Sequence, residues 1–360
     1  MADNKKICVL LPNWIDSMNI YIRELGRAYQ RTGCELIYGV DNFYETTVDA
    51  DIVHLNWPEA FYRWHGMGSA EKRAERFIGA IDKYKNKGAK IVWTVHNLTP
   101  HDHVKSGLDY DVYQSVIERA DIIAHHCEKS IDLLKAHYKV HDNIENIVLP
   151  HGNYLAYPSG ITRKEARARL AIPDNAYVYL HFGAIRSYKG LDSLFSVFGK
   201  VNNPDKWLLV AGNYQGITGK GAWRDKLLMY WARHWAKRTT LYLKNIPSED
   251  IQIFLAASDC MVLSHSRGLN SGVAVLGMTF GKLIIGPKLG CIEWVLDAGK
   301  NISFDVNSSD ALIKAMNQAV NYDGKEVNKV NSSIASEWTW DGMVKKILEH
   351  PLVRARTANG

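Results

Sequence analysis

The sequence predicts an α/β fold made of two doubly wound domains with parallel sheets. Short apolar runs alternate with segments of helical periodicity, which is typical of strand–helix–strand units. Most of these runs are apolar at every position, as expected for parallel strands buried on both faces. The alternation also breaks near residue 160 and then restarts, and a chain of 360 residues is long enough for two domains of roughly 150 residues.

The first domain is predicted over residues 1–157. Its helices are expected at 19–32 and 70–87, where apolar residues recur at helical spacing. Its strands are expected at 6–12, 51–57, 89–96, 121–125 and 146–150. The stretch 157–175 is charged and interrupted by proline and glycine, so it is predicted to connect the two domains.

The second domain is predicted over residues 158–335, with strands at 177–183, 207–212, 260–264 and 282–286. Residues 336–360 place Trp338 and Trp340 ahead of a terminal helix. Two alternatives remain for this helix: it can cross back and pack on the first domain, or it can be the last helix of the second domain.

Composition excludes several classes of protein. Hydrophobic residues make up 46% and charged residues 23%, which is ordinary for a globular protein and excludes a disordered or collagen-like chain. No window approaches the ~20 apolar residues of a membrane span, and the N-terminus turns polar too soon for a signal peptide. A cytoplasmic protein is therefore expected, with peripheral contact to the inner face of the membrane as a further expectation.

The net charge of +6 is concentrated in residues 220–244, which hold seven Lys or Arg and one Asp. Tryptophan and tyrosine residues interleave with these cations, as in an interfacial helix at an anionic membrane surface. An amphipathic helix packed on the core with a solvated basic face is the alternative. A nucleic-acid partner is not predicted, because no known nucleic-acid module is present.

Ligands of open α/β sheets bind beyond the carboxyl ends of the strands, so the residues after each apolar run are the candidates. In the second domain Gly183, Arg186 and Lys189 follow a strand, where two cations could neutralise a diphosphate. Further along, Asn270, Ser271 and Gly272 precede a helix of small residues, whose first backbone N–H groups favour a phosphate. The alternatives are a solvated loop and a simple N-cap at Ser271.

These segments carry a resemblance to a known family. The G-x-x-R-x-x-K-G loop at 183–190, the strand ending in Gly212, the stretch 246–266 and the helix followed by 281–295 resemble the donor half of a GT-B glycosyltransferase of the family-4-like group 1. The segments 94–102 and 149–158 resemble bacterial exopolysaccharide β-mannosyltransferases of the xanthan-assembly type. The resemblance implies two Rossmann-like domains facing a central cleft.

The same resemblance implies a function. It implies transfer of a hexose from a nucleoside diphosphate sugar, with GDP-mannose as the first donor and a UDP-sugar as the next. The implied acceptor is a glycan, lipid-linked by expectation, in bacterial surface polysaccharide synthesis. No cofactor is expected, and no metal either, because the spacing of the histidines fits no common site; the histidines considered are His96, His101, His103, His125 and His126.

The resemblance also assigns roles to residues. His96 resembles the histidine that hydrogen-bonds the donor sugar, with a structural imidazole as the alternative. The diphosphate is assigned to Gly183, Arg186, Lys189, Asn270, Ser271 and Gly272. The nucleoside is assigned to Asn213, Ile246 and Glu293, and the acceptor to Asn13, Asn19, Trp57 and Asn97.

One departure concerns the mechanism. Retaining enzymes of the family usually carry a Glu-x7-Glu pair, and the matching positions here are Gly268 and Leu276. An inverting transfer is therefore favoured, and it needs a base for the acceptor hydroxyl. Asp16 is one candidate for this base, and Asp102, oriented by His101, is the other. A loop-stabilising role for Asp16, a retaining transferase and a non-catalytic module that binds sugar nucleotides are the open alternatives.

Overall fold

The structure, a computed structural model, describes residues 6–13, 19–64, 67–100, 107–214, 230 and 238–358. The chain forms two compact units, Met1–Gly152 with Trp338–Gly360 and Asn153–Glu337. Residues 153–157, which the sequence analysis places in the first domain, thus belong to the second unit. The C-terminal segment belongs to the first unit.

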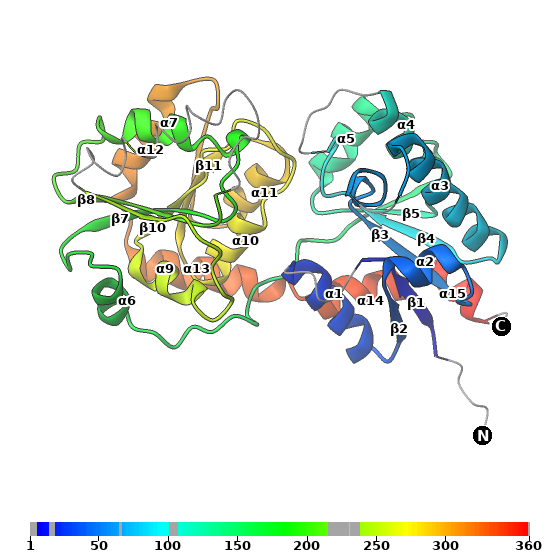
Figure 1. The fold of residues 1–360 in the computed structure, drawn as a ribbon. Helices are drawn as coiled ribbons and strands as arrows, with labels where there is room; N and C mark the ends of the chain where they lie inside the picture. Colours follow the sequence, from blue (N-terminus) through cyan, green and yellow to red (C-terminus); the bar gives the residue numbers. More distant parts are fainter. Residues whose placement is uncertain are drawn as a thin grey trace. The chain divides into compact units, whose positions relative to one another are not determined.

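In its described residues the first unit has a six-stranded parallel sheet in the order β2-β1-β3-β4-β5-β6. Helices lie on both faces of this sheet (Figure 1). The strands are β1 (Cys8–Leu11), β2 (Glu35–Tyr38), β3 (Ile52–Asn56), β4 (Lys90–Thr94), β5 (Ile122–His125) and β6 (Glu145–Val148). The helices are α1 (Ile20–Arg31), α2 (Val40–Glu45), a π-helical turn (Ala60–Trp64), α3 (Ala70–Asn86), α4 (Gly107–Arg119), α5 (Glu128–His137), α14 (Trp340–Leu348) and α15 (Pro351–Ala358).

One face of the first sheet is covered by segments from both ends of the chain. Alternate buried residues of the strands pack against α1 and against α14, which contributes Trp340, Val344 and Ile347. The helix α14 starts with a side-chain cap, because Thr339 accepts a hydrogen bond from the backbone of Gly342. The C-terminal segment is therefore part of the core of the first unit.

In its described residues the second unit also has a six-stranded parallel sheet, in the order β12-β11-β10-β7-β8-β9. The strands are β7 (Tyr177–Phe182), β8 (Lys206–Ala211), β9 (Thr239–Tyr242), β10 (Cys260–Val262), β11 (Leu283–Pro287) and β12 (Ile302–Phe304). The helices are α6 (Arg163–Arg169), a 3-10 turn (Ser187–Lys189), α7 (Leu191–Phe198), α9 (Ile251–Ala257), α10 (Gly272–Thr279), α11 (Gly290–Ala298), α12 (Ser309–Ala319) and α13 (Gly324–Glu337).

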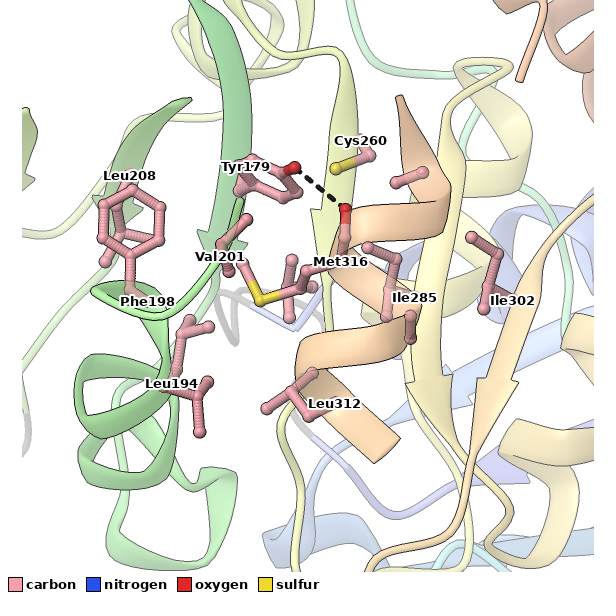
Figure 2. Packing of buried hydrophobic residues seen from close by; sticks show 14 of the residues in the cluster. Tyr179, Leu194, Phe198, Val201, Leu208, Cys260, Ile285, Ile302, Leu312 and Met316 are labelled. Atoms are coloured by element: carbon pink, nitrogen blue, oxygen red, sulfur yellow. Dashed lines mark hydrogen bonds between the residues drawn. The ribbon is translucent and has the colours of Figure 1, made fainter. Parts of the chain in front are cut away.

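The core of the second unit lies between the sheet and the helices α7 and α12 (Figure 2). Tyr179 on β7 sits in this core, and its hydroxyl donates to the carbonyl oxygen of Met316 at 2.9 Å. On the other face, Gly277 lets α10 approach Met261 and Ile284 closely. Both sheets are thus doubly wound, which confirms the predicted fold class.

The structure corrects two predictions of secondary structure. Residues 239–242, at the end of the basic run 220–244, form the edge strand β9 and not a helix; residues 220–229 and 231–237 lie outside the described residues. The strands β2, β9 and β12 were absent from the predicted set. Two of these, β2 and β9, are partly exposed edge strands, so they lack the continuous apolar run of a central strand.

Candidate functional site

The donor-side candidates lie where the strand order of the second sheet reverses. The first strand of this unit, β7, lies between β8 and β10, so the crevice at their carboxyl ends is a topological switch point. Here Gly183 and Gly212 have positive φ angles, and a side chain on Gly212 would overlap the carbonyl oxygen of Gly183. The backbone N–H of Ile185 donates to the carbonyl of Asn213 at 2.8 Å. The loops after β7 and β8 are therefore packed directly on each other.

Lys189 is a buried charged residue at the carboxyl ends of these strands. It is only 8% exposed, and a methyl group on Gly183 would lie 3.3 Å from its Nζ and 3.2 Å from the side chain of Val273 in α10. The Ser264 hydroxyl donates to the carbonyl of Lys189 at 2.8 Å. The loop after β7, the loop after β10 and the first turn of α10 thus meet around one buried ammonium group.

The electrostatics of this cluster favour an anion. Burial and, to a lesser extent, the positive charge of Arg186 together lower the pKa of Lys189 to about 8. Burial also lowers the pKa of His181 to about 3, with Lys189 as the second cause, so this imidazole is neutral at pH 7. The positive charges of Lys189 and Arg186 therefore repel each other.

The start of α10 adds backbone donors. Ser271 occupies the N-cap position with an extended backbone, but among the described residues its side chain makes no capping hydrogen bond. Ser271 is thus the N-cap residue of α10 by position, but in the described part of the chain it lacks the side-chain hydrogen bond that usually accompanies this position. The first turn of α10 begins at Gly272 and presents the positive end of the helix dipole.

The predicted nucleoside residues lie on the surrounding loops. Glu293 is half-buried in the first turn of α11, whose residue Cys291 donates its backbone N–H to Leu269 at 2.8 Å. This bond ties α11 to the segment that leads into Asn270. Ile246 follows β9 and is half-buried, whereas the side chain of Asn213 is exposed. Their contact with a nucleoside stays a prediction.

In the first unit, His96 and Trp57 form a stack at the carboxyl end of the sheet. Their rings lie 3.9 Å apart at an angle of 17°, and Nε2 of His96 pairs with Oδ1 of Asn56 at 2.8 Å. Trp57 has a φ of +40°, an uncommon left-handed conformation for a bulky residue and one that clusters at functional sites. The centroids of the Tyr21 and His96 rings lie 4.5 Å apart, and the two rings are nearly perpendicular at 87°.

Two histidines lie beside this stack, and the sequence analysis did not predict them as site residues. His126 and His151 lie 5.3 Å and 5.1 Å from His96 and Tyr21 respectively, and burial lowers their pKa values to about 4 and about 3. Both imidazoles are thus neutral at pH 7. The sequence pattern that could have indicated these two histidines was weak, because each of them only follows a strand and lies in no recognisable motif.

Asn97, a predicted acceptor residue, is bonded to a buried carboxyl group. Glu59 is 1% exposed, accepts from the Tyr113 hydroxyl at 2.7 Å, and lies 3.5 Å from the amide nitrogen of Asn97. Burial raises the pKa of Glu59, and both hydrogen bonds oppose that rise. Glu59 thus holds Asn97 in place, a role that its position after β3 alone does not reveal.

Of the remaining candidates of the first unit, two lie among the described residues and three do not. Asn19 caps α1, since its side chain accepts from the backbone of Tyr21 at 3.0 Å, and Asn13 is half-buried after β1. The candidate bases Asp16 and Asp102 and the predicted orienting residue His101 lie outside the described residues.

No group of three or more His, Cys, Asp or Glu side chains in the part described could hold a metal ion. None of the described helices is long and apolar enough to cross a bilayer.

Part of the chain matches a known family of enzymes. Residues 162–334 match the family model of the glycosyl transferases group 1. GDP-mannose:glycolipid 4-beta-D-mannosyltransferase of Xanthomonas campestris pv. campestris is 25% identical over 245 residues, which are 66% of this chain and 61% of that protein. The match thus spans less than two thirds of this relative.

Solved structures share the fold. Sucrose-phosphate synthase of Thermosynechococcus elongatus superposes with a TM-score of 0.75 and 15% identity, covering 99% of this chain and all of that chain. HepE of Anabaena, solved with UDP and glucose, gives a TM-score of 0.73 and 15% identity, covering 95% and 98% of the two chains. Residues 162–334 thus match the group 1 glycosyltransferases, and the chain has the GT-B fold.

Proposed function

We propose that the protein transfers a hexose from a nucleoside diphosphate sugar to a glycan acceptor. The observation that carries this proposal is the buried ammonium of Lys189, placed against Gly183 and the first turn of α10. A buried cation beside a helix N-terminus is a site for a diphosphate, because both groups stabilise negative charge. The family match of the second unit agrees with this assignment.

The chemistry follows from where charge develops. As the bond between the sugar and the diphosphate breaks, negative charge grows on the leaving phosphate. Lys189, Arg186 and the N–H groups of α10 would stabilise that charge without a metal ion. His96, held by Asn56 at 2.8 Å, would hydrogen-bond the sugar.

We further propose GDP-mannose as the donor, a lipid-linked glycan as the acceptor, and inversion at the anomeric carbon. The Xanthomonas relative is named for GDP-mannose, a glycolipid and a β-linkage. Because GDP-mannose carries its sugar in the α configuration, a β product requires inversion. The absence of a carboxylate at Gly268 and Leu276 supports the same mechanism.

Inversion requires a base that takes the proton of the acceptor hydroxyl. Asp16 and Asp102 remain the candidates, on the sequence alone. The basic and aromatic run 220–244 supports an acceptor at an anionic membrane surface, also on the sequence alone.

The first experiment measures thermal stabilisation by GDP, UDP, ADP and TDP. Stabilisation by GDP is expected for the wild type and for Lys206→Met, a control lysine at the amino end of β8, and is expected to be lost in Lys189→Met. No stabilisation by any nucleotide at millimolar concentration would contradict the donor site.

The second experiment incubates the protein with GDP-mannose and lipid-linked glycan acceptors and reads the anomeric configuration of the product by NMR. A β product is expected, and either Asp16→Asn or Asp102→Asn should lower kcat by about 10²- to 10⁴-fold. An α product would establish retention. Nucleotide binding without transfer to any acceptor would favour the non-catalytic module.

A further inference from the structure

Two adjoining cavities lie at the amino ends of the strands of the second sheet. Their volumes are about 310 and 260 Å³, and both are lined by Lys282 and Asn328. Lys282 directly precedes β11 and Asp259 directly precedes β10, so these cavities lie at the amino ends of the strands. Lys189 follows β7 and the start of α10 follows β10, so both lie at the carboxyl ends of these parallel strands. The cavities are therefore separate from the proposed donor site.

The smaller cavity, of about 260 Å³, is lined by more positive than negative side chains. The two carboxylate oxygens of Asp259 accept from Arg163 at 2.5 Å and from Arg167 at 2.9 Å. Lys282 adds a third cation, and in the described part of the chain its ammonium donates to the backbone carbonyl of Ser258 at 2.9 Å. Asp259 is the only acidic residue among those described as lining the two cavities. Three cations thus surround one carboxylate.

This excess charge affects Lys282. The pKa of Lys282 is lowered to about 8, mainly by burial, and the nearby guanidinium groups of Arg163 and Arg167 contribute to this decrease. The Asp259 carboxylate opposes these effects but does not cancel them. An anion beside Lys282 would offset the repulsion among the three cations.

The larger cavity has an apolar wall and an open mouth. Leu155, Tyr157 and Ile161 line it from the segment that precedes α6, and Phe280 lines it from the end of α10. Leu155 is 62% exposed, an unusual position for a large apolar side chain beside a cavity. Combined, the two cavities are of the size that holds a small organic ligand, roughly 300–1,000 Å³.

We propose that the two cavities form one site for an amphipathic organic anion. Its apolar part packs against Leu155, Tyr157 and Phe280, and its anionic group binds Lys282 beside Arg163. Apolar walls with a few converging polar groups are typical of small-molecule sites. This site is distinct from the one that binds the donor.

The test uses hexyl phosphate, with hexanol and inorganic phosphate as its two halves, in calorimetric titrations of the whole protein. Hexyl phosphate is expected to bind with a stoichiometry of one, and each half at least tenfold more weakly. Lys282→Met keeps the aliphatic stem and is expected to lower the affinity at least tenfold. Leu155→Glu, at an exposed position that tolerates substitution, is expected to do the same by repelling the anion.

Two matched controls and one competition complete the test. Lys206→Met removes a lysine that also donates to backbone carbonyls, and Met67→Glu adds a charge at an exposed position in the first unit; both should keep the affinity within twofold. Saturating GDP should also leave it within twofold. Absence of binding at millimolar hexyl phosphate, an unchanged affinity in Leu155→Glu, or displacement by GDP would each overturn the proposal, whatever the outcome for donor binding.

Discussion

At the scale of single residues, Lys189 is held in a state that favours a ligand. Burial and the neighbouring charge of Arg186 both make its protonated form less stable, which lowers its pKa to about 8. A diphosphate acts in the opposite direction, because its negative charge stabilises the ammonium. If the donor diphosphate binds at Lys189, as we propose, its binding is therefore coupled to the protonation of Lys189.

This coupling predicts how donor affinity depends on pH. Below pH 8 Lys189 is already protonated, so the affinity for GDP should be nearly constant. Above pH 8 binding must take up a proton, so the Kd should rise as pH increases, by up to about tenfold per pH unit. Calorimetric titrations at pH 8.5 in buffers of different ionisation enthalpy should detect the proton uptake.

Lys189→Met is the control for this pH dependence. It should bind GDP more weakly than the wild type and with little change in Kd between pH 8 and 9.5. The same slope in the variant and the wild type would assign the pH dependence to another group.

At the scale of elements, the loops after β7, β8 and β10 depend on glycines that allow close backbone approach. Gly212 has a φ of +154°, and any side chain there would overlap the carbonyl of Gly183. Gly190 has a φ of +63° and lies against the carbonyl of Ser264 in the same way. Because Lys189 stands directly before Gly190, the same packing positions its ammonium.

Gly212→Ala should therefore destabilise the second unit by about 2–4 kcal/mol and weaken GDP binding. Gly199→Ala is the matched control, since Gly199 has helical backbone angles and no atom within 4 Å of the added methyl group. It should be neutral or stabilising, by about 0.4–1 kcal/mol. Urea unfolding of both variants measures the difference, and equal stabilities would show that the loops tolerate the extra atom.

The elements also show how much the sequence could reveal. Central strands such as β4 and β10 are apolar on both faces, so their pattern is unambiguous. The edge strand β9 has no fully buried residue, so its pattern is weak. The proximity of Gly183 to Lys189 could be expected from the sequence because both lie in one local motif, whereas their contact with a diphosphate stays a prediction. The contact of Glu59 with Tyr113 joins residues 54 positions apart, and no local motif encodes it.

At the scale of the whole molecule, the last segment of the chain completes the first unit. The helix α14 buries Trp340, Met343, Val344 and Ile347 in the core that also contains Tyr21 of α1. A side chain on Gly152 would overlap the ring of Trp340, so this ring lies directly on the backbone where the first unit ends. The first unit is thus formed by residues from both ends of the sequence.

Deleting residues 338–360 should unfold the first unit and leave the second intact. The four buried side chains of α14 contribute roughly 7–14 kcal/mol, which is comparable to the entire stability of a typical domain, about 5–15 kcal/mol. Hydrogen exchange should therefore show loss of protection in β1–β6 and retained protection in β7–β12. GDP binding to the second unit should survive, since Lys189 and α10 lie outside the deleted segment and the unit it completes.

Asp341→Ala is the control for the deletion, because it changes the same helix without touching its buried face. It removes the ion pair with Arg31, in which both side chains are about half exposed, and such pairs contribute about 0–1 kcal/mol. Protection in β1–β6 should stay close to that of the wild type. If the deletion variant also kept that protection, the packing of α14 on α1 would not be what stabilises the first unit, and the first 152 residues would have to fold without it.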